Sequence, residues 1–344
     1  MTMVIGALDI GGTKMAATIA TAGGPLARIS EPTVKSGATD APALQAVALL
    51  ERACTEAGID PATLQDVGVS SCGPFVIVDG TINLVTPNIC GGIAARGDLP
   101  NDWTQLPLQR VLEQHFGNVV IRNDCIAALH GERMFGVLSA EPNCVYVTWS
   151  TGIGFGLCVD GHLLSGKQGN AGHAGHLLMA PDSTIRCGCG NLGDLEALIS
   201  GSNISRGLSQ DTPALFAAAR SGETAALASV TAAAVWLGRA LYNLVVTLDT
   251  RVFVIGGSVW QHHGDWLMPI VQHEIDSRFA VLTAGVTIVS PGLDAYVTDV
   301  GALCLVMPPE WISDWRQHER WRLLDHLPNC AFTSATQALR GAPA

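Results

Sequence analysis

The sequence predicts an α/β protein with two lobes, and three observations support this prediction. The chain has 344 residues, which is more than one hydrophobic core usually serves. Short apolar runs typical of strands alternate along it with stretches of helical periodicity. The pattern of strand, glycine turn and strand occurs near residue 5 and again near residue 145, which suggests two lobes with similar cores.

The first half of the chain supplies the elements of one lobe. A clear helical pattern runs over residues 43–57, where Leu44, Val47, Leu50 and Cys54 recur every three or four residues. The other expected elements are strands over 4–10, 15–21, 66–70 and 119–122, a hairpin over 75–84 that turns at Asp79-Gly80, and helices over 106–115 and 125–135.

The second half begins with strands over 145–149 and 155–159. Later come a long helix over 225–248, a strand that ends at Gly256-Gly257, and a helix near Val300. We therefore assign residues 1–122 to a small N-terminal lobe, 123–308 to a larger lobe and 309–344 to an extension. In the extension we expect one helix to pack on the body, and the Ala/Gly/Pro-rich end to be loose; the packing residues would be Trp311, Trp315 and Trp321.

Composition excludes several classes of protein. Hydrophobic residues make up 48% of the chain, but no stretch approaches the ~18 uninterrupted apolar residues of a membrane span. No basic region precedes the apolar start, so we expect no signal peptide, and the ten scattered cysteines suggest a reducing cytoplasm. A net charge of -11 argues against nucleic acid as the main partner. Any phosphate must therefore be held locally, by backbone amides and a metal ion.

Three glycine turns carry the first chemical indication. The first lies between two predicted strands, where its glycines let backbone amides approach a phosphate, and its aspartate could orient Mg²⁺ through water. Because a strand follows, it is neither a dinucleotide fingerprint nor a Walker loop, both of which open a helix. A lone Gly-Gly hairpin is more often only a turn. Three such turns at strand ends indicate a nucleotide held between two lobes: Asp9-Ile10-Gly11-Gly12-Thr13-Lys14, Thr151-Gly152-Ile153-Gly154 and Gly256-Gly257.

The second indication is Arg122-Asn123-Asp124, between a predicted strand and a predicted helix. A carboxylate at the end of that strand would project into the cleft. It could accept the proton of an alcohol that attacks phosphorus. The alternative is that Asp124 only caps the helix that starts at Cys125.

A glycine-rich region supplies the third indication. It contains His173 and His176, and then Cys187, Cys189 and Asp194. One histidine, a Cys-x-Cys pair and an aspartate five residues later form a plausible tetrahedral zinc set. The alternative is a loop without zinc, held by hydrogen bonds of Asp194.

These motifs together resemble the ROK family of sugar kinases. The likeness runs from about residue 4 to residue 306 and implies the two-lobed actin-like (ribonuclease H-like) ATPase fold, with a nucleotide cleft between the lobes. The family's phosphate motif corresponds to Asp9–Lys14, its second phosphate turn to Thr151–Gly154, and its adenosine-side glycines to Gly256-Gly257. The resemblance implies ATP and Mg²⁺ as ligands, a structural Zn²⁺ and a homodimer.

The resemblance also implies roles for the residues of the sugar site. Asp124 would be the base and Asn123 would hold a substrate hydroxyl. His176 would serve both zinc and sugar, and Glu196 would reach the sugar from the zinc loop. The segments Pro87-Asn88 and Cys72-Gly73-Pro74 match those that line the family's sugar pocket, through Asn88 and Gly73. The zinc ligands would be His176, Cys187, Cys189 and Asp194.

The chain departs from the family at two positions. It has His173-Ala174-Gly175-His176 where the family usually has Glu-x-Gly-His, and Asp194 where the family usually has a third cysteine. A carboxylate oxygen is an accepted zinc ligand, although a harder one than a thiolate. Neutral imidazole offers one donor and one acceptor, whereas a glutamate only accepts. His173 is thus either a specificity contact or a harmless exchange outside the sugar site.

From these roles we expect ATP-dependent phosphorylation of a hexose or hexose-like substrate, at the 6-hydroxyl as in the family. We do not expect a ROK-type DNA-binding repressor, because the predicted phosphate turn begins at residue 9 and leaves no room for a preceding helix-turn-helix. The alternatives from other classes are a catalytically weak sugar or nucleotide sensor, and an actin-like ATPase without sugar kinase activity. ADP release on adding a sugar would distinguish the kinase from both.

Overall fold

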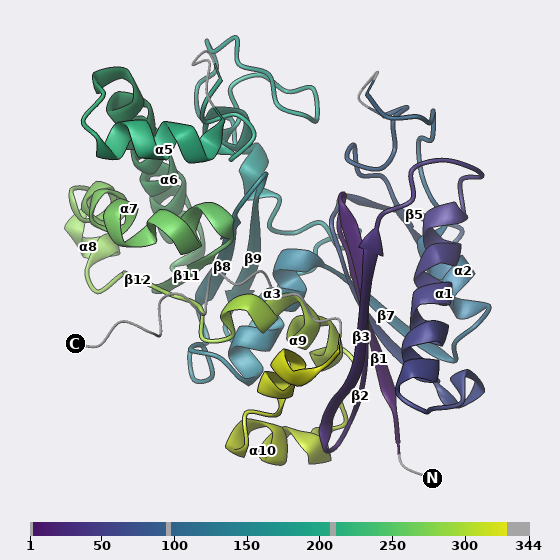
Figure 1. Cartoon of the computed structure of the whole chain (residues 1–344). Helices are drawn as coiled ribbons and strands as arrows, with labels where there is room; N and C mark the ends of the chain where they lie inside the picture. Colours follow the sequence, from purple (N-terminus) through teal and green to yellow (C-terminus); the bar gives the residue numbers. More distant parts are fainter. Residues whose placement is uncertain (1–2, 94–97, 207–210, 329–344) are drawn as a thin grey trace. The chain divides into compact units, whose positions relative to one another are not determined.

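The computed structural model describes residues 3–93, 98–206 and 211–328, and the chain divides into two compact units (Figure 1). As far as they are described, the first unit comprises Met1–Cys90, Leu99–Asp124 and the chain from Ala295 onward. The second comprises Gly91–Asp98 and Cys125–Asp294. Each contains a mixed sheet of five strands, so the predicted two-lobed α/β fold is confirmed.

The sheet of the first unit has the order β3-β2-β1-β4-β7. β1 pairs antiparallel with β2 and parallel with β4, and β4 pairs parallel with β7. The register places Asp9 beside Ser70, and Ser71 beside Asn123, so the carboxyl ends of three parallel strands share one edge. The strands are β1 (Ile5–Ile10), β2 (Lys14–Thr21), β3 (Gly24–Pro32), β4 (Asp66–Ser71) and β7 (Asn118–Asn123).

Helices and a hairpin complete the first unit. α1 (Ala41–Glu56) begins with a proline in its first turn and buries an apolar face that includes Val47 and Leu50 against the sheet. α2 (Leu108–Glu113) follows the hairpin of β5 (Phe75–Val78) and β6 (Thr81–Leu84). That hairpin turns at Asp79 and Gly80, both with positive φ, as the sequence predicts.

The last described part of the chain returns to the first unit. α9 (Val297–Cys304) covers the face of the sheet opposite α1 (Figure 1), so closely that a Cβ on Gly68 would lie 1.9 Å from the Ala302 carbonyl oxygen. α10 (Pro309–Gln317) follows, and the Trp315 indole donates a hydrogen bond to the Thr21 carbonyl at 3.2 Å. The three tryptophans predicted to pack on the body are buried.

The two compact units differ from the lobes that were assigned from the sequence. That assignment placed residues 123–308 in the second lobe and treated 309–344 as an appendage. Packing of α9 on β1 and β4 instead joins the chain from Ala295 to the first unit. The Ala/Gly/Pro-rich end, 329–344, lies outside the described residues.

The second unit repeats the plan of the first. Its sheet has the order β10-β9-β8-β11-β12, with β8 antiparallel to β9 and parallel to β11. The repeated strand, glycine turn and strand therefore opens both sheets. The strands are β8 (Cys144–Trp149), β9 (Ile153–Val159), β10 (His162–Leu163), β11 (Val252–Gly256) and β12 (Thr287–Val289). The helices are α3 (Asp124–Met134), α4 (Leu195–Ile199), α5 (Thr212–Arg220), α6 (Thr224–Leu248), α7 (Ser258–Asp276) and α8 (Ala280–Thr283).

One helix of the described residues, α6, is long and apolar enough to cross a membrane by length and composition alone. It packs between α5 and α7, and side chains such as Leu237 and Leu241 are fully buried in the core of the second unit. A core helix passes the same test, so α6 is weak evidence for a membrane span.

Candidate active site and metal centre

Three candidate residues lie at the carboxyl edge of the first sheet. Asp9 is the second-last residue of β1, β7 ends at Asn123, and α3 begins directly at Asp124. Ligands of open α/β sheets bind at such edges, where strand ends and helix starts meet. Gly73 follows β4 at the same edge, and the Cys72 N–H before it donates to the Ile10 carbonyl at 3.0 Å. The edge thus gathers the predicted base, its neighbouring amide and the predicted magnesium-orienting aspartate.

The first glycine turn is fixed by its own backbone and by Thr33. The Gly11 N–H donates to the Lys14 carbonyl at 3.0 Å, and the Thr33 hydroxyl donates to the Gly11 carbonyl at 2.7 Å. A Cβ on Gly12 would lie only 2.6 Å from Cβ of Asn88. Glycine is therefore required at position 12, and Asn88 lies against this glycine turn.

The Asp9 carboxyl has a strongly perturbed pKa, which is raised to about 7. Burial is the largest cause, followed by the negative charges of Asp299 and Asp124, while Arg28 and Lys14 oppose the rise. An excess of negative charge at a phosphate turn is the environment that a bound Mg²⁺ would neutralise.

A buried polar network near Asp9 is not among the features predicted from the sequence. The Asp299 side chain, 2% exposed on α9, accepts from the Thr18 hydroxyl at 2.6 Å and from Nε of Arg28 at 2.9 Å, both through Oδ1. Arg28, on β3, is 7% exposed. Among the described residues nothing donates to Oδ2 of Asp299. The available indication in the sequence was a single charge in each of two apolar segments, around residues 28 and 299.

The second and third glycine turns lie against each other in the second unit. The Ser150 carbonyl accepts from the Gly201 N–H at 2.8 Å, and the Ser150 hydroxyl oxygen accepts from the Ser258 N–H at 2.9 Å. Gly257 has a φ of 89°, and a Cβ there would lie 2.6 Å from the Trp149 backbone. The turn at Thr151–Gly154 and the start of α7 therefore form one surface, and a helix start of this kind favours anions.

Glu196 connects the second glycine turn to the cysteine pair. Its Oε2 accepts from the Ile153 N–H at 3.1 Å, and a Cβ on Gly152 would lie 2.7 Å from the same oxygen. Its Oε1 accepts from Sγ of Cys187 at 3.2 Å. Glu196, which is predicted to reach a sugar, is thus oriented on one side by the second glycine turn and on the other by Cys187, a candidate metal ligand.

The four predicted zinc ligands converge. One donor atom from each of His176, Cys187, Cys189 and Asp194 lies within 4.8 Å of the others. Nδ1 of His176 is 3.0 Å from Oδ2 of Asp194 and 3.6 Å from Sγ of Cys189, which is itself 3.6 Å from the same Oδ2. Ligands ~2.0–2.3 Å from a tetrahedral zinc ion lie about 3.3–3.8 Å apart. The residues therefore fit a zinc ion.

Asp194 can replace the usual cysteine because its two oxygens do different work. Oδ1 accepts from the Ala197 N–H at 2.8 Å and so caps α4, while Oδ2 faces the other ligands. Burial raises the pKa of this carboxyl, which is 1% exposed, but hydrogen bonds from His176 and Ala197 outweigh it and hold the pKa below its usual value. Burial raises the pKa of Cys187, so this thiol needs a cation beside it to ionise.

His173 lies beside this group, with its ring centroid 6.2 Å from that of His176. Burial, followed by the charge of His176, lowers its pKa, so its imidazole is neutral at pH 7. A hydrogen bond to the Asn170 backbone opposes the fall in pKa and occupies one ring nitrogen, so His173 can offer a substrate the other nitrogen.

We expect zinc to be retained at one equivalent per chain and lost when Asp194 is changed. Asp194→Ala removes both a ligand and a helix cap, so protein purified without chelator should hold less than about a tenth of an equivalent by elemental analysis. Asp211→Ala is the matched control, because Asp211 caps α5 through the same contact, from Ala214 N–H at 2.9 Å, but lies outside the cluster. Zinc-free parent protein with an intact loop would contradict the expectation.

Comparison with known proteins covers most of the chain. The sequence model of the family described as "ROK family" matches residues 5–306 of the chain. The chain belongs to the ROK family. It is 30% identical to a glucokinase of Pyrobaculum calidifontis, over 79% of this chain and 83% of that one. It is 32% identical to an N-acetylmannosamine kinase of Escherichia fergusonii, over 74% and 82%.

A solved structure supports the same relationship. The ROK family glucokinase of Streptomyces griseus, in complex with glucose and AMPPNP, superposes with a TM-score of 0.62 and 25% identity, covering 88% of this chain and 98% of that one. All the candidate residues described above lie within the part that matches the ROK family, and the described tail from residue 307 to 328 lies beyond it.

Proposed function

We propose that this ROK-type carbohydrate kinase transfers the γ-phosphoryl group of ATP to the 6-hydroxyl of a hexose or hexose-like substrate, with Asp124 as the general base. The observation that carries the proposal is the convergence of Asp124, Asn123 and Asp9 at the carboxyl ends of the parallel strands β1, β4 and β7, beside a glycine turn. A base next to a phosphate site is what transfer to an alcohol needs.

The phosphates of ATP would be held mainly by backbone amides. In the first unit these belong to Gly12, Thr13 and Lys14, while Gly11, whose N–H donates to the Lys14 carbonyl, shapes the turn. In the second unit they belong to the turns Thr151–Gly154 and Gly256-Gly257 and to the start of α7, apart from the N–H groups of Ile153 and Ser258, which donate to Glu196 and Ser150. Asp9 would orient Mg²⁺ through water, and a bound Mg²⁺ would neutralise negative charge on the transferred group.

The sugar would contact the remaining candidate residues. Asn123, 5% exposed at the end of β7, holds a hydroxyl beside the base, and Asp124 takes the proton of the attacking hydroxyl. Nδ1 of His176 faces the other predicted zinc ligands, which leaves its Nε2 for the sugar. Glu196, His173, Gly73 and Asn88 complete the proposed contacts.

The named relatives narrow the substrate class to a sugar, since they include a glucokinase and an N-acetylmannosamine kinase. Within that class we keep glucose, amino sugars, N-acetylhexosamines and inositols as candidates. The complex of a relative with AMPPNP supports ATP as the donor. A homodimer in the cytoplasm is part of the same proposal, on the resemblance to the family.

A coupled assay of ADP release over hexoses, amino sugars, N-acetyl sugars and inositols tests the proposal. We expect release that depends on one of these sugars. Sugar binding without ADP release would instead favour a sensor, and light scattering that depends on ATP alone would favour a filament-forming ATPase.

We expect His173→Glu to shift the order of preferred substrates. Neutral imidazole replaces a carboxylate that makes a charge-assisted hydrogen bond, worth about 1.5–3 kcal/mol, to a hydroxyl. The variant should therefore raise kcat/KM for glucose or its N-acetylated relatives, relative to the native substrate, by roughly 10–150-fold. His162→Glu, the same change at an exposed position on β10, is the control. An unchanged ranking would remove His173 from the specificity contacts.

A further inference from the structure

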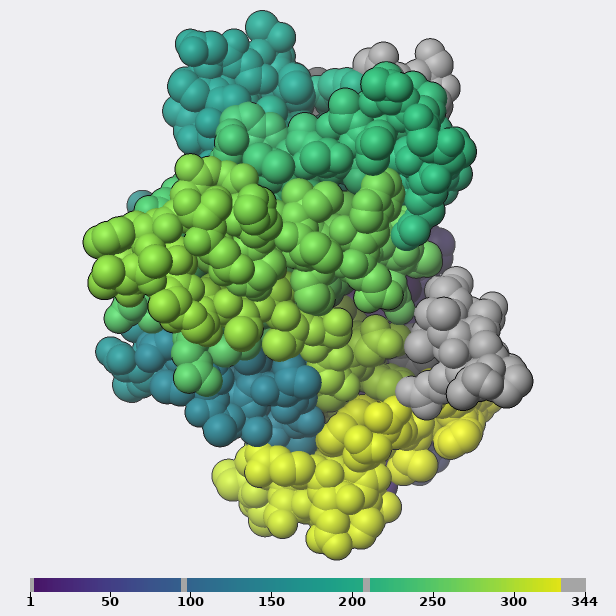
Figure 2. Space-filling view, turned by 90° about the vertical axis from the view of Figure 1, so that its left-hand side faces the viewer, coloured from purple at the N-terminus to yellow at the C-terminus, as the bar shows by residue number. Residues whose placement is uncertain are grey.

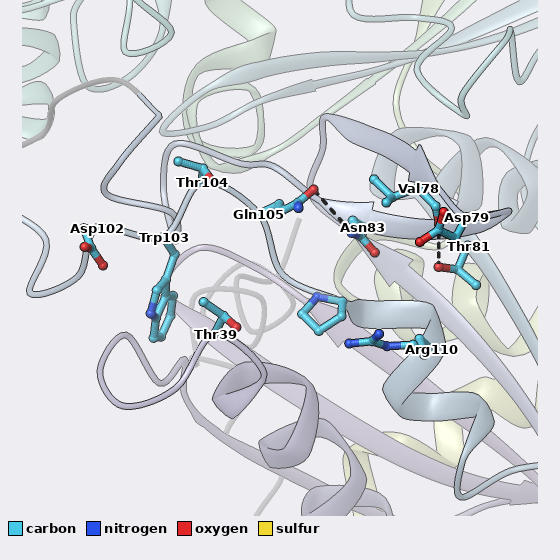
Figure 3. Close-up of a pocket in the computed structure, with 11 residues that line it drawn as sticks. Thr39, Val78, Asp79, Thr81, Asn83, Asp102, Trp103, Thr104, Gln105 and Arg110 are labelled. Carbon is cyan, nitrogen blue, oxygen red and sulfur yellow. Dashed lines mark hydrogen bonds between the residues drawn. The ribbon is translucent and has the colours of Figure 1, made fainter.

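The first unit contains a cavity of 460 Å³ that no step of the proposed reaction uses (Figure 3). It lies between the β5–β6 hairpin, the segment 102–107, α2 and the loop before α1. None of the candidate catalytic, sugar, nucleotide or zinc residues lines it. Its volume is within the ~300–1,000 Å³ of small-molecule sites. The lining is Thr39, Val78, Asp79, Thr81, Asn83, Asp102, Trp103, Thr104, Gln105, Pro107 and Arg110.

The chemistry of the lining is that of a hydroxyl-rich ligand. It offers two amides and three hydroxyls, with an indole at one end that is 4% exposed. Asn83, itself 7% exposed, donates from Nδ2 to Oε1 of Gln105 at 3.3 Å, and Figure 3 shows the two amides facing each other across the cavity wall. No described residue donates to Oδ1 of Asn83 or accepts from Nε2 of Gln105. Oδ1 of Asn83 therefore remains as an acceptor for a ligand, and Nε2 of Gln105 remains as a donor.

The charges of the lining select against an anion. Two carboxylates, of Asp79 and Asp102, and one guanidinium, of Arg110, leave it a net charge of -1. Within the described part of the chain these three groups form no ion pair, so all three can hydrogen-bond an occupant. The chain as a whole also carries -11, which disfavours phosphates further.

The wall of the cavity is held in place by backbone contacts. Asn101 donates from Nδ2 to the carbonyls of Lys35 at 2.9 Å and Ile89 at 3.0 Å, and accepts from the Trp103 N–H at 3.2 Å. Leu106 pairs with Leu84 of β6 through both backbone hydrogen bonds. These bonds fix the backbone along one wall of the cavity, which lowers the part of the ordering cost of binding that comes from this segment.

We infer that this cavity is a second binding site, for a neutral carbohydrate of one or two rings, separate from the site of phosphoryl transfer. Hydroxyl groups of such a ligand match the amides and threonines, and a carbohydrate carries no charge that opposes the net -1 of the lining. The inference does not depend on Asp124 chemistry, and its test uses no turnover.

Maltose is the probe, titrated calorimetrically into the full chain and three variants. We expect weak binding to the parent, with Kd on the order of 1 mM. Gln105→Leu, at an exposed position on the wall, should weaken it at least ~10-fold by removing the spare donor. Asn88→Ala, in the candidate sugar site, and Gln114→Ala, exposed beyond the cavity at the end of α2, should leave it unchanged.

Three outcomes would overturn the inference. The first is no binding of maltose to the parent. The second is binding that is lost in Asn88→Ala and kept in Gln105→Leu, which would assign it to the candidate sugar site. Glucose 6-phosphate that binds Gln105-dependently and more tightly than maltose would show that the cavity takes an anion. Glucosamine is titrated in parallel, and its Kd relative to that of maltose measures whether the lining prefers a cationic sugar.

Discussion

Asp124→Asn is expected to lower kcat by roughly 10²–10⁴-fold, because an amide cannot accept the proton of the attacking hydroxyl. The side chain keeps its size, so the melting temperature and the sugar Kd should stay close to those of the parent. Steady-state kinetics, calorimetric sugar titration and thermal melting of one preparation measure the three quantities.

Asp249→Asn is the matched control for this change. Asp249 ends α6 with a left-handed φ of 53°, a conformation that asparagine also adopts readily, and it is exposed. The control should therefore equal the parent in all three measurements. An Asp124→Asn enzyme that keeps more than about a tenth of the parent rate would leave Asp124 as a helix-start residue only.

The second large effect is expected at the buried pair of Arg28 and Asp299. Arg28→Met removes the cation and leaves Asp299, 2% exposed, with a hydrogen bond from the Thr18 hydroxyl. Loss of one member of a buried ion pair costs about 3–5 kcal/mol, because the other charge stays in a medium that solvates it poorly. The free energy of unfolding in urea measures the loss.

A double-mutant cycle distinguishes this cause from loss of packing. In Arg28→Met with Asp299→Leu both charges are absent, so the double variant should recover most of the stability of the parent. A double variant that is as unstable as the sum of the two single variants would mean that packing, and not the unpaired charge, causes the loss.

Local patterns in the sequence predicted the strands and turns that bear the candidate site. β1, β2, β8 and β9 lie within two residues of their expected bounds, because apolar alternation and glycine turns are local properties. The Asn123-Asp124 junction and the cluster around His176 follow from motif spacing in the same way.

Elements and contacts that depend on distant residues were not predicted. β3 is not among the predicted strands. It contains Pro25 and Pro32, which are rare inside sheets, and it is the edge strand of its sheet, where they are tolerated. α7, with Pro269 inside it, was missed as well. Arg28 and Asp299 meet across 271 positions.

Buried Glu132 is a further case, in the second unit. Its carboxylate accepts from the N–H groups of Val137, Gly292 and Leu293. Burial raises the pKa of this carboxyl, and the three hydrogen bonds oppose the rise. No periodicity separates such a residue from an exposed helix glutamate, because two of its three partners lie 160 and 161 positions away.

The return of α9 to the first sheet has a consequence for synthesis of the chain on the ribosome. β1, β4 and β7 are complete once Asn123 has been made, but the helix that covers one face of their sheet ends only at Cys304. At ~5–20 residues per second the interval is about 10–40 s. During that time the face around Gly68 has no cover, whereas the contiguous segment Cys125–Asp294 can already fold. The nascent first unit is therefore the part of this protein that most needs protection from aggregation, and a ribosome-bound chaperone would meet it in that state.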